Sequence, residues 1–278
     1  MMLELKGIRK IVNTFLLSKT PRIARIYNRV YTRVADVRDK LYIKRYMKQT
    51  GLAHLPPADL RNRVHGSTNP RSFLEVGKKC SEDLESTLRN IHKDIGSFRD
   101  ILDFGCGCGR TLMWFGKRSL PSNFFGTDID ADAISWCRNN LDFASFSVNN
   151  ALPPLDYPSE TFDLIYALSV FTHLHEDYQY YWLSELKRIV KPKGILLLTV
   201  HGQYVWKDLP PDHLAKIEKE GFVFVPENAY KGIFPEWYQN AFHTKDYVLE
   251  RWSPYFNILD YIPRGLNNHQ DMVVLQKA

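Results

Sequence analysis

The sequence predicts an α/β fold: a seven-stranded, mostly parallel sheet with helices on both faces. Three observations carry this prediction. From about residue 99 onward, short apolar segments alternate with segments that have the period of amphipathic helices. A glycine-rich turn separates the first apolar segment from the helix that follows it. The last two apolar segments have no helix between them, which predicts an antiparallel pair at one end of the sheet.

The expected strands and helices follow each other in a regular order. Strands joined by helical crossovers are expected to be parallel, because the crossover returns the chain to the same end of the sheet. Asp130 is the expected N-cap of one helix, and Pro192 with Gly194 ends another. The expected strands span 101–104, 123–128, 143–148, 162–168, 195–200, 256–262 and 272–276, and the expected helices span 109–118, 130–141, 176–190 and 243–252.

Two segments precede this core. Residues 1–50 are expected to form a basic helical extension, with one apolar face over residues 8–16 and a new helix start at Thr20-Pro21. Residues 51–98 are expected to contribute a loop and a helix over 74–96 that cap the ligand site. Steps of three and four place a second apolar stripe on the extension, which is expected to pack on a partner helix or on the core: Ile23, Tyr27, Val30, Val34, Val37 and Leu41.

The alternation breaks over residues 201–242, an insertion before the last helix of the main domain, which spans 99–278. We expect this insertion to be β-rich, with a hairpin formed by residues 222–225 and 232–234. Long segments outside a compact core tend to serve function, so a substrate lid is favoured over a hydrophobic flap packed on the sheet. Its aromatic residues include Tyr204, Trp206, Trp237 and Tyr238.

Composition and cysteine usage limit the class of protein. The chain is 44% hydrophobic and 24% charged, as is ordinary for a globular protein. No apolar run approaches the roughly 18 residues that span a bilayer, and the N-terminus lacks the pattern of a signal peptide. A cytoplasmic location is therefore expected. The four cysteines have no zinc-site or disulfide spacing, so reduced thiols and no metal site are expected.

Positive charge is concentrated at the N-terminus. Residues 1–48 hold thirteen Lys and Arg against three acids, while the whole chain carries a net charge of +6. Such a leader suits a solvated helical cap, an anionic membrane surface or a nucleic acid. Nucleic acid is the least favoured of the three, because no nucleic-acid-binding motif or aromatic stacking platform accompanies the charge. Peripheral membrane contact through residues 1–48 stays open, as does the oligomeric state.

The segment 101–118 has the arrangement of a nucleotide-binding site: a strand, a glycine turn and a helix. Glycines keep side chains away from a ligand, and the amides at the helix start point toward it. Asp103 lies just before the turn, and Asp128 ends the second strand, where a carboxylate can accept both ribose hydroxyls. Asn150 follows the third strand. Each of these polar residues also has a purely structural interpretation, as a turn cap, a helix cap and a loop residue.

Four motifs in this order resemble those of the class I S-adenosylmethionine-dependent methyltransferases. Residues 101–110, Ile-Leu-Asp-Phe-Gly-Cys-Gly-Cys-Gly-Arg, are similar to the first motif of that superfamily, and Thr127-Asp128-Ile129-Asp130 to its ribose-binding step. Residues 162–174 resemble its fourth-strand motif, and residues 186–194 resemble the turn before its fifth strand. The resemblance covers residues 99–200 closely and 243–277 loosely, and it implies a Rossmann-like fold with S-adenosylmethionine as the cofactor.

The resemblance also implies roles for individual residues. The turn from Gly105 to Gly109 would contact the methionine part of the cofactor, Asp128 the ribose and Asn150-Ala151 the adenine. A dinucleotide dehydrogenase, the main competitor, would place its third glycine at position 110, where this chain has an arginine. The expected cofactor site comprises Asp103, Gly105, Cys106, Gly107, Gly109, Arg110, Asp128, Ile129, Asn150 and Ala151, with Leu168 and Ser169 facing the sulfonium end.

The methyl acceptor is less constrained. Candidate general bases are His173, His201, His243 and His269, of which His173 and His243 are favoured, and a proximity mechanism without a base is equally open. The fourth strand lacks the Asn/Asp-Pro-Pro-Tyr run of enzymes that methylate amines of bases. We therefore expect a small-molecule or glycan acceptor, methylated at oxygen or nitrogen. The alternative is a cofactor-binding scaffold without turnover, held on a membrane or a nucleic acid by its leader.

Overall fold

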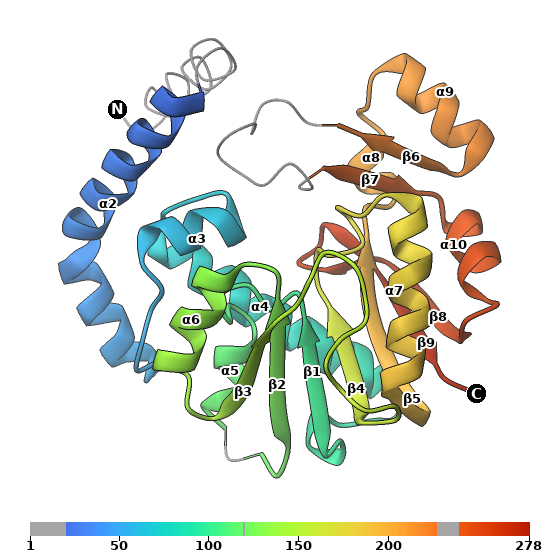
Figure 1. Cartoon of the computed structure of the whole chain (residues 1–278), viewed down its shortest axis with the longest axis horizontal. Coiled ribbons are helices and arrows are strands. Elements are labelled where there is room, and N and C mark those ends of the chain that lie inside the picture. Colours follow the sequence, from blue (N-terminus) through green and yellow to red (C-terminus); the bar gives the residue numbers. More distant parts are fainter. Residues whose placement is uncertain (1–20, 119, 227–238) are drawn as a thin grey trace.

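The computed structural model in Figure 1 describes residues 21–118, 120–226 and 239–278. The helical face expected over residues 8–16 and the strand expected at 232–234 lie outside the described residues, as do Trp237 and Tyr238. The described chain forms a seven-stranded sheet with helices packed against it and a separate two-stranded sheet.

The seven-stranded sheet has the order β3-β2-β1-β4-β5-β9-β8. Strands β1 to β5 are parallel to their neighbours among these five, and β9 is antiparallel to both of its neighbours. The predicted seven-stranded, mostly parallel sheet is therefore confirmed. The strand order reverses between β1 and β4, the position at which such sheets bind ligands. The strands are β1 (Asp100–Phe104), β2 (Asn123–Asp128), β3 (Ala144–Val148), β4 (Phe162–Ala167), β5 (Val190–Val200), β8 (Asn257–Leu266) and β9 (Gln270–Gln276).

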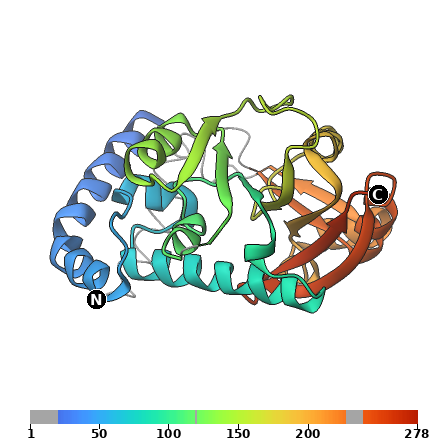
Figure 2. The ribbon, with the colours of Figure 1, turned by 90° about the horizontal axis from the view of Figure 1, so that it is seen from below.

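Alternate strand residues point into two separate cores, one on each face of the sheet. Ile101 and Leu164 belong to the first core, while their chain neighbours Leu102 and Ile165 belong to the second. Figure 2 shows the long helix α4 running along one face. The predicted cover of both faces is confirmed: α4 (Pro70–Asn90), α5 (Leu112–Gly116) and α6 (Ala131–Asn140) pack in the first core, and α7 (Glu176–Ile189) and α10 (Lys245–Trp252) in the second.

Helix α4 begins four residues before the expected position and ends at Asn90 instead of residue 96. Its start is set by Asn69, whose side chain accepts hydrogen bonds from the backbone N–H groups of Arg71 and Ser72. Pro70 then occupies the first helical turn, where its missing N–H costs nothing. A short 3₁₀ turn over Ile95–Ser97 links the helix to the sheet.

The helical extension is present as α2 (Pro21–Thr50), which lies beside α3 (Ala58–His65) (Figure 1). Among the α2 residues whose side chains are described, Thr32, Ala35 and Asp39 are buried. The expected packing stripe lies on the other side of the helix: the described members Val30, Val34, Val37 and Leu41 are exposed, and Tyr27 is exposed as well. Of the two expected partners of this stripe, the core is therefore ruled out, and packing on a partner helix stays a prediction.

The orientation of α2 follows from Arg61 on α3, whose side chain is almost fully buried. Its guanidinium lies 3.5 Å from Asp36 and 3.8 Å from Asp39, the two acids of the described part of α2. A buried cation requires such partners. Because both acids must face α3, helix geometry turns the apolar stripe outward.

The insertion contains two short helices as well as strands, which corrects the expectation that it is β-rich. Helices α8 (Gln203–Trp206) and α9 (Pro211–Glu220) precede β6 (Phe222–Val225). Strand β6 pairs in antiparallel fashion with β7 (Asn240–His243), and its expected partner, residues 232–234, lies outside the described residues. Within the described ranges, no helix combines the length and apolar character that crossing a bilayer requires.

Candidate functional site

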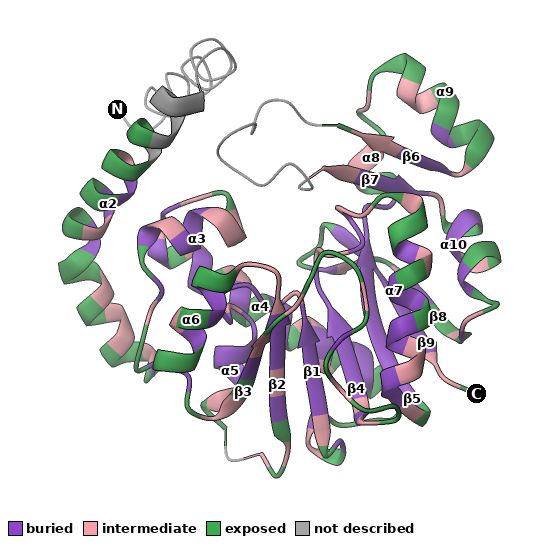
Figure 3. Cartoon of the chain, in the orientation of Figure 1, coloured by how far each residue is buried: buried purple, intermediate pink, exposed green. Residues whose placement is uncertain are grey.

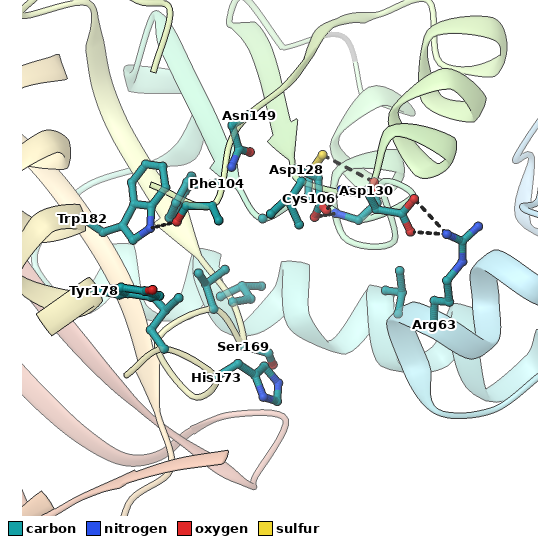
Figure 4. Close-up of a pocket in the computed structure, with 18 of the residues that line it drawn as sticks. Arg63, Phe104, Cys106, Asp128, Asp130, Asn149, Ser169, His173, Tyr178 and Trp182 are labelled. Carbon is teal, nitrogen blue, oxygen red and sulfur yellow. Dashed lines mark hydrogen bonds and ion pairs between the residues drawn. The ribbon is translucent and has the colours of Figure 1, made fainter. Parts of the chain in front are cut away.

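A cleft of about 1170 Å³ opens at the carboxyl ends of β1, β2 and β4, beside the reversal of strand order (Figure 4). Pockets for single drug-sized ligands span roughly 300–1,000 Å³, so this cleft has room for a cofactor and a second small molecule. The glycine turn and Asp128 form one wall, and residues of the β4–α7 segment and the insertion form another.

The turn after β1 is held by its own backbone. The N–H groups of Gly105 and Cys106 both donate to the carbonyl oxygen of Thr127, at 2.8 and 3.0 Å. Gly105 has φ +80°, and a Cβ there would lie 2.2 Å from a methyl carbon of Val170. A side chain at this position is therefore excluded both by backbone conformation and by space. The result is a bare backbone surface facing the cleft.

Asp128 fastens the turn to the second strand. One carboxylate oxygen accepts from the N–H of Gly107 at 2.7 Å, and the other accepts from the N–H of Asp130 at 2.8 Å. Burial raises the pKa of Asp128, and these backbone donors act against that rise. The carboxylate lines the cleft, so its outer lone pairs face a ligand.

Helix α3 reaches the same cleft from the opposite side. Arg63 lines it and forms ion pairs with Asp130 at 2.7 Å and Asp132 at 3.2 Å, at the N-terminus of α6 (Figure 4). Val64 lies against the turn, 2.7 Å from where a Cβ of Gly107 would be. Residues 51–98 therefore contribute Arg63 and Val64 to the lining of this site. Sequence reasoning did not single out Arg63.

Asp103 is buried at the base of the cleft. Burial raises the pKa of its carboxyl group to about 8, and the nearby charge of Asp128 adds to the rise. Asp103 is therefore protonated at neutral pH as long as no cation lies beside it. A carboxyl group held in this way responds strongly to an arriving positive charge.

An aromatic wall lies where β1 and α7 meet. The rings of Phe104 and Trp182 have their centroids 4.6 Å apart, and the indole N–H of Trp182 donates to the carbonyl oxygen of Ala151 at 3.3 Å. Both rings line the cleft next to Asn149, which accepts a hydrogen bond from the hydroxyl of Thr127. These residues were missed from the sequence, because Trp182 lies 78 positions beyond Phe104 in the chain.

The structure brings most of the predicted site residues together at this cleft. Gly109 is an exception: its φ of +71° serves close packing against Leu141 and Cys137. All four cysteines are free and buried, and burial raises the thiol pKa of Cys106 and Cys108. The predicted residues that line the cleft are Asp103, Gly105, Cys106, Gly107, Arg110, Asp128, Ile129, Asn150, Ala151, Leu168, Ser169 and His173.

Of the two favoured histidines, only His173 faces the cleft. Its Nδ1 lies 2.5 Å from the carbonyl oxygen of Gln239, which assigns the proton to Nδ1 and makes Nε2 the basic nitrogen. Burial lowers the pKa of His173. His243 is fully buried in the core, with Nε2 3.0 Å from the side-chain oxygen of Gln179. The structure therefore does not place His243 at the site, and burial lowers its pKa to about 3.

Ser169 has φ +60°, an uncommon conformation for a residue with a side chain, and lines the cleft after β4. Its N–H donates to the hydroxyl of Thr199 at 2.8 Å, and its hydroxyl bonds the side chain of Gln270. His201 is buried behind His173, with the ring centroids 6.1 Å apart. Burial lowers the pKa of His201 to about 3, with neighbouring histidines adding to the shift.

The insertion contributes to the far wall through Phe224, Pro226 and Gln239. Two of its expected lid aromatics lie elsewhere. The ring of Tyr204 stacks under Arg264, and the indole N–H of Trp206 donates to the carbonyl oxygen of His243 at 2.9 Å. Across the described ranges, no three His, Cys, Asp or Glu side chains are arranged to hold a metal ion.

Known proteins share parts of this chain. Residues 102–198 match the family model of a methyltransferase domain. A segment of 107 residues is 32% identical to a probable methyltransferase of Aspergillus luteorubrus, covering 34% of this chain and 38% of that protein. A segment of 111 residues is 30% identical to an rRNA N(6)-adenosine-methyltransferase of Caenorhabditis elegans, covering 37% and 52%. The matches thus span about half or less of these relatives.

Solved structures agree on the fold. An S-adenosylmethionine-dependent methyltransferase of Mesorhizobium loti superposes with a TM-score of 0.52 at 15% identity, covering 69% of this chain and 96% of that one. At this identity the likeness concerns the fold alone. It extends beyond the family match, because it covers 69% of this chain, whereas the family model matches residues 102–198 alone.

Proposed function

We propose that this chain, which belongs to the class I S-adenosylmethionine-dependent methyltransferases through its domain at residues 102–198, binds that cofactor in the cleft and methylates a small molecule. The observation that carries the proposal is the placement of two carboxyl groups in the cleft: Asp103 just before the bare glycine turn, and Asp128 bonded to Gly107 within it. S-adenosylmethionine carries a cationic ammonium group, a ribose diol and an activated methyl group on a sulfonium.

The residues present suit those groups. Asp103 would face the ammonium group as a carboxylate, and Asp128 would accept hydrogen bonds from the ribose hydroxyls. Asn150 and Ala151 would border the adenine, with Phe104 and Trp182 supplying apolar ring surface. Leu168 and Ser169 would lie beside the sulfonium, at the end of the cleft where His173 also lies.

The acceptor would bind between the β4–α7 segment and the insertion, residues 201–242, which would act as its lid. The lining there combines apolar and aromatic side chains with polar ones: Val170, Leu174, Tyr178, Phe224, Pro226, His175, Asp177 and Gln239. Of the two favoured histidines, only His173 lines this part of the cleft. His173 would accept a proton from an acceptor hydroxyl or amine as the bond to the methyl group forms.

Asp128→Asn is expected to weaken S-adenosylmethionine binding about 10- to 100-fold, because hydrogen bonds to a charged acceptor contribute about 1.5–3 kcal/mol. The substitution also removes the acceptor of either Gly107 or Asp130. Isothermal titration calorimetry measures the affinity. Asp246→Asn, in the exposed first turn of α10 and outside the cleft, is the matched control and should change it little. Wild-type affinity in Asp128→Asn would contradict the ribose role.

Asp103 leads to a proton-linked binding prediction. A cofactor ammonium beside it favours the carboxylate and lowers its pKa from about 8, so binding at pH 6–7 should release up to about one proton. Affinity should therefore rise with pH toward about 8, by no more than about tenfold per unit, and fall above it, where the α-amino group of the cofactor loses its own proton. Calorimetry in buffers of different ionisation enthalpy counts the protons. Asp103→Asn should release none, and a wild type that releases none would refute the contact.

A cofactor-binding scaffold without turnover is separated from an enzyme by a labelling experiment. Cell extract is incubated with the protein and S-adenosylmethionine labelled in its methyl group, and labelled products are identified. A labelled small molecule supports the proposal, whereas labelled RNA would redirect it toward the activity named for the nematode relative. Cofactor binding without any labelled product supports the scaffold. No binding of cofactor well above micromolar concentration would overturn both.

A further inference from the structure

Helix α2 carries a continuous apolar row on its outer side. Val30, Val34, Val37 and Leu41 are 57%, 60%, 75% and 85% exposed, and Ile26 extends the row by one turn with 63%. Their spacing of four, four, three and four residues keeps them on one face. Single exposed apolar residues are ordinary on a protein surface, but a row of five over four helical turns indicates a binding surface. Figure 3 shows α2 exposed along most of its length.

The charged residues around this row are all of one sign. Asp36 and Asp39, the acids of the described part of α2, turn toward Arg61 on the opposite side. The cations between residues 29 and 48 are exposed, and they flank the row or follow it at the end of the helix: Arg29, Arg33, Arg38, Lys40, Lys44, Arg45 and Lys48. The outer side of α2 therefore combines an apolar centre with a basic border.

We propose that this side of α2 is a docking surface for an anionic lipid bilayer. An interfacial helix inserts its apolar row at the boundary of headgroups and acyl chains, while basic side chains at its borders meet anionic headgroups. A second copy of the chain fits less well. In a helix pair packed along this row, Arg33, Arg38 and Lys40 would flank the seam and meet like charges. A nucleic acid would use the cations and leave the valine row without a partner.

The docking surface is joined to the candidate active site. The backbone N–H of Ala58, at the start of α3, donates to Asp36 at 2.8 Å, and Arg61 on α3 pairs with both acids of α2. The same short helix carries Arg63, whose side chain lines the cleft and pairs with Asp130. A membrane bound through α2 therefore lies one helix away from the cleft.

Vesicle binding of the full chain tests this proposal. The double variant Val37→Gln/Leu41→Gln removes the two most exposed residues of the row. The matched control, Tyr181→Gln/Leu259→Gln, removes two apolar residues that are 53% and 44% exposed on α7 and β8. Flotation is measured with vesicles of phosphatidylcholine alone and with vesicles that also contain roughly 30% phosphatidylserine.

The wild type and the control should bind the anionic vesicles at least roughly tenfold better than the neutral ones. Val37→Gln/Leu41→Gln should lose roughly tenfold or more of that binding, and Lys40→Glu/Lys44→Glu should lose the preference for phosphatidylserine. Undiminished binding by Val37→Gln/Leu41→Gln would overturn the proposal. So would a wild-type dimer, seen by light scattering, that this variant converts to a monomer.

Cofactor affinity is measured in parallel by calorimetry. The α2 variants should bind S-adenosylmethionine as the wild type does, because none of the substituted residues lines the cleft. Loss of vesicle binding with intact cofactor binding supports the membrane surface. If the wild type does not bind the anionic vesicles, the docking surface is refuted and the methyltransferase proposal is unaffected.

Discussion

His173→Gln is expected to lower kcat/KM for methyl transfer by about 10²–10⁴-fold while the affinity for S-adenosylmethionine stays within roughly twofold. The assay uses the acceptor identified by methyl labelling. Glutamine retains an N–H that can donate to the carbonyl oxygen of Gln239, so the wall of the cleft should stay in place. It has no basic nitrogen, so only proton removal from the acceptor is lost.

The pH dependence of the wild type provides a second test of the same role. Burial lowers the pKa of His173 below the ordinary 6.5, so its imidazole is neutral and basic throughout the neutral range. At saturating S-adenosylmethionine, the rate should therefore be constant near pH 7 and should fall on the acid side only when the pH passes below the ordinary histidine pKa of 6.5. In His173→Gln this acid limb should be absent.

His54→Gln, at an exposed histidine outside the cleft, is the control for the chemical change itself and should behave as the wild type. If His173→Gln retains most of the wild-type kcat/KM, the reaction proceeds by proximity and orientation alone, and the base assignment is wrong. A parallel loss of cofactor affinity would instead indicate that His173 supports the structure of the cleft.

The cofactor wall was predictable because its signals are local. The glycine turn, Asp103 and Asp128 are specified by short stretches of sequence, and parallel strands bring their carboxyl ends to one edge without further information. His243 was not predictable in the same way. It opens the final helix in the sequence, but pairing of β7 with β6 and packing against Gln179 turn its ring into the core.

The residues that sequence reasoning missed come from distant segments. Arg63 reaches Asp130 across 67 positions of the chain, and no local pattern links them. Periodicity likewise predicted an apolar face on α2 and left its direction open. That direction depends on Arg61, a buried cation whose partners are two acids on the other side of the helix. The need to pair the buried charge of Arg61 therefore sets the direction of the apolar face, which hydrophobic periodicity alone does not determine.

The second large effect is expected at Arg61 itself. Arg61→Met should lower the free energy of unfolding by about 3 kcal/mol, the lower end of the range for breaking a buried ion pair. Methionine fills much of the space of the arginine stem but has no donors. The carbonyl oxygens of Pro56 and Thr68 lose their hydrogen bonds, and Asp39 stays buried beside an apolar side chain. The lower end applies because Asp36 reaches solvent and Arg38 still pairs with Asp39.

Urea denaturation measures the change, and hydrogen exchange locates it. Amide protection should fall in the second half of α2 and in α3 before it falls in β1, because Arg61 joins these two helices to each other.

Adding Asp36→Asn and Asp39→Asn to Arg61→Met should lower the free energy of unfolding little more than Arg61→Met alone, since the acids no longer have a buried partner to lose. Arg71→Ala, which breaks an exposed pair with Glu75, should leave the urea midpoint nearly unchanged. Arg61→Met with wild-type stability would show that the orientation of α2, and with it the outward apolar row, has another cause.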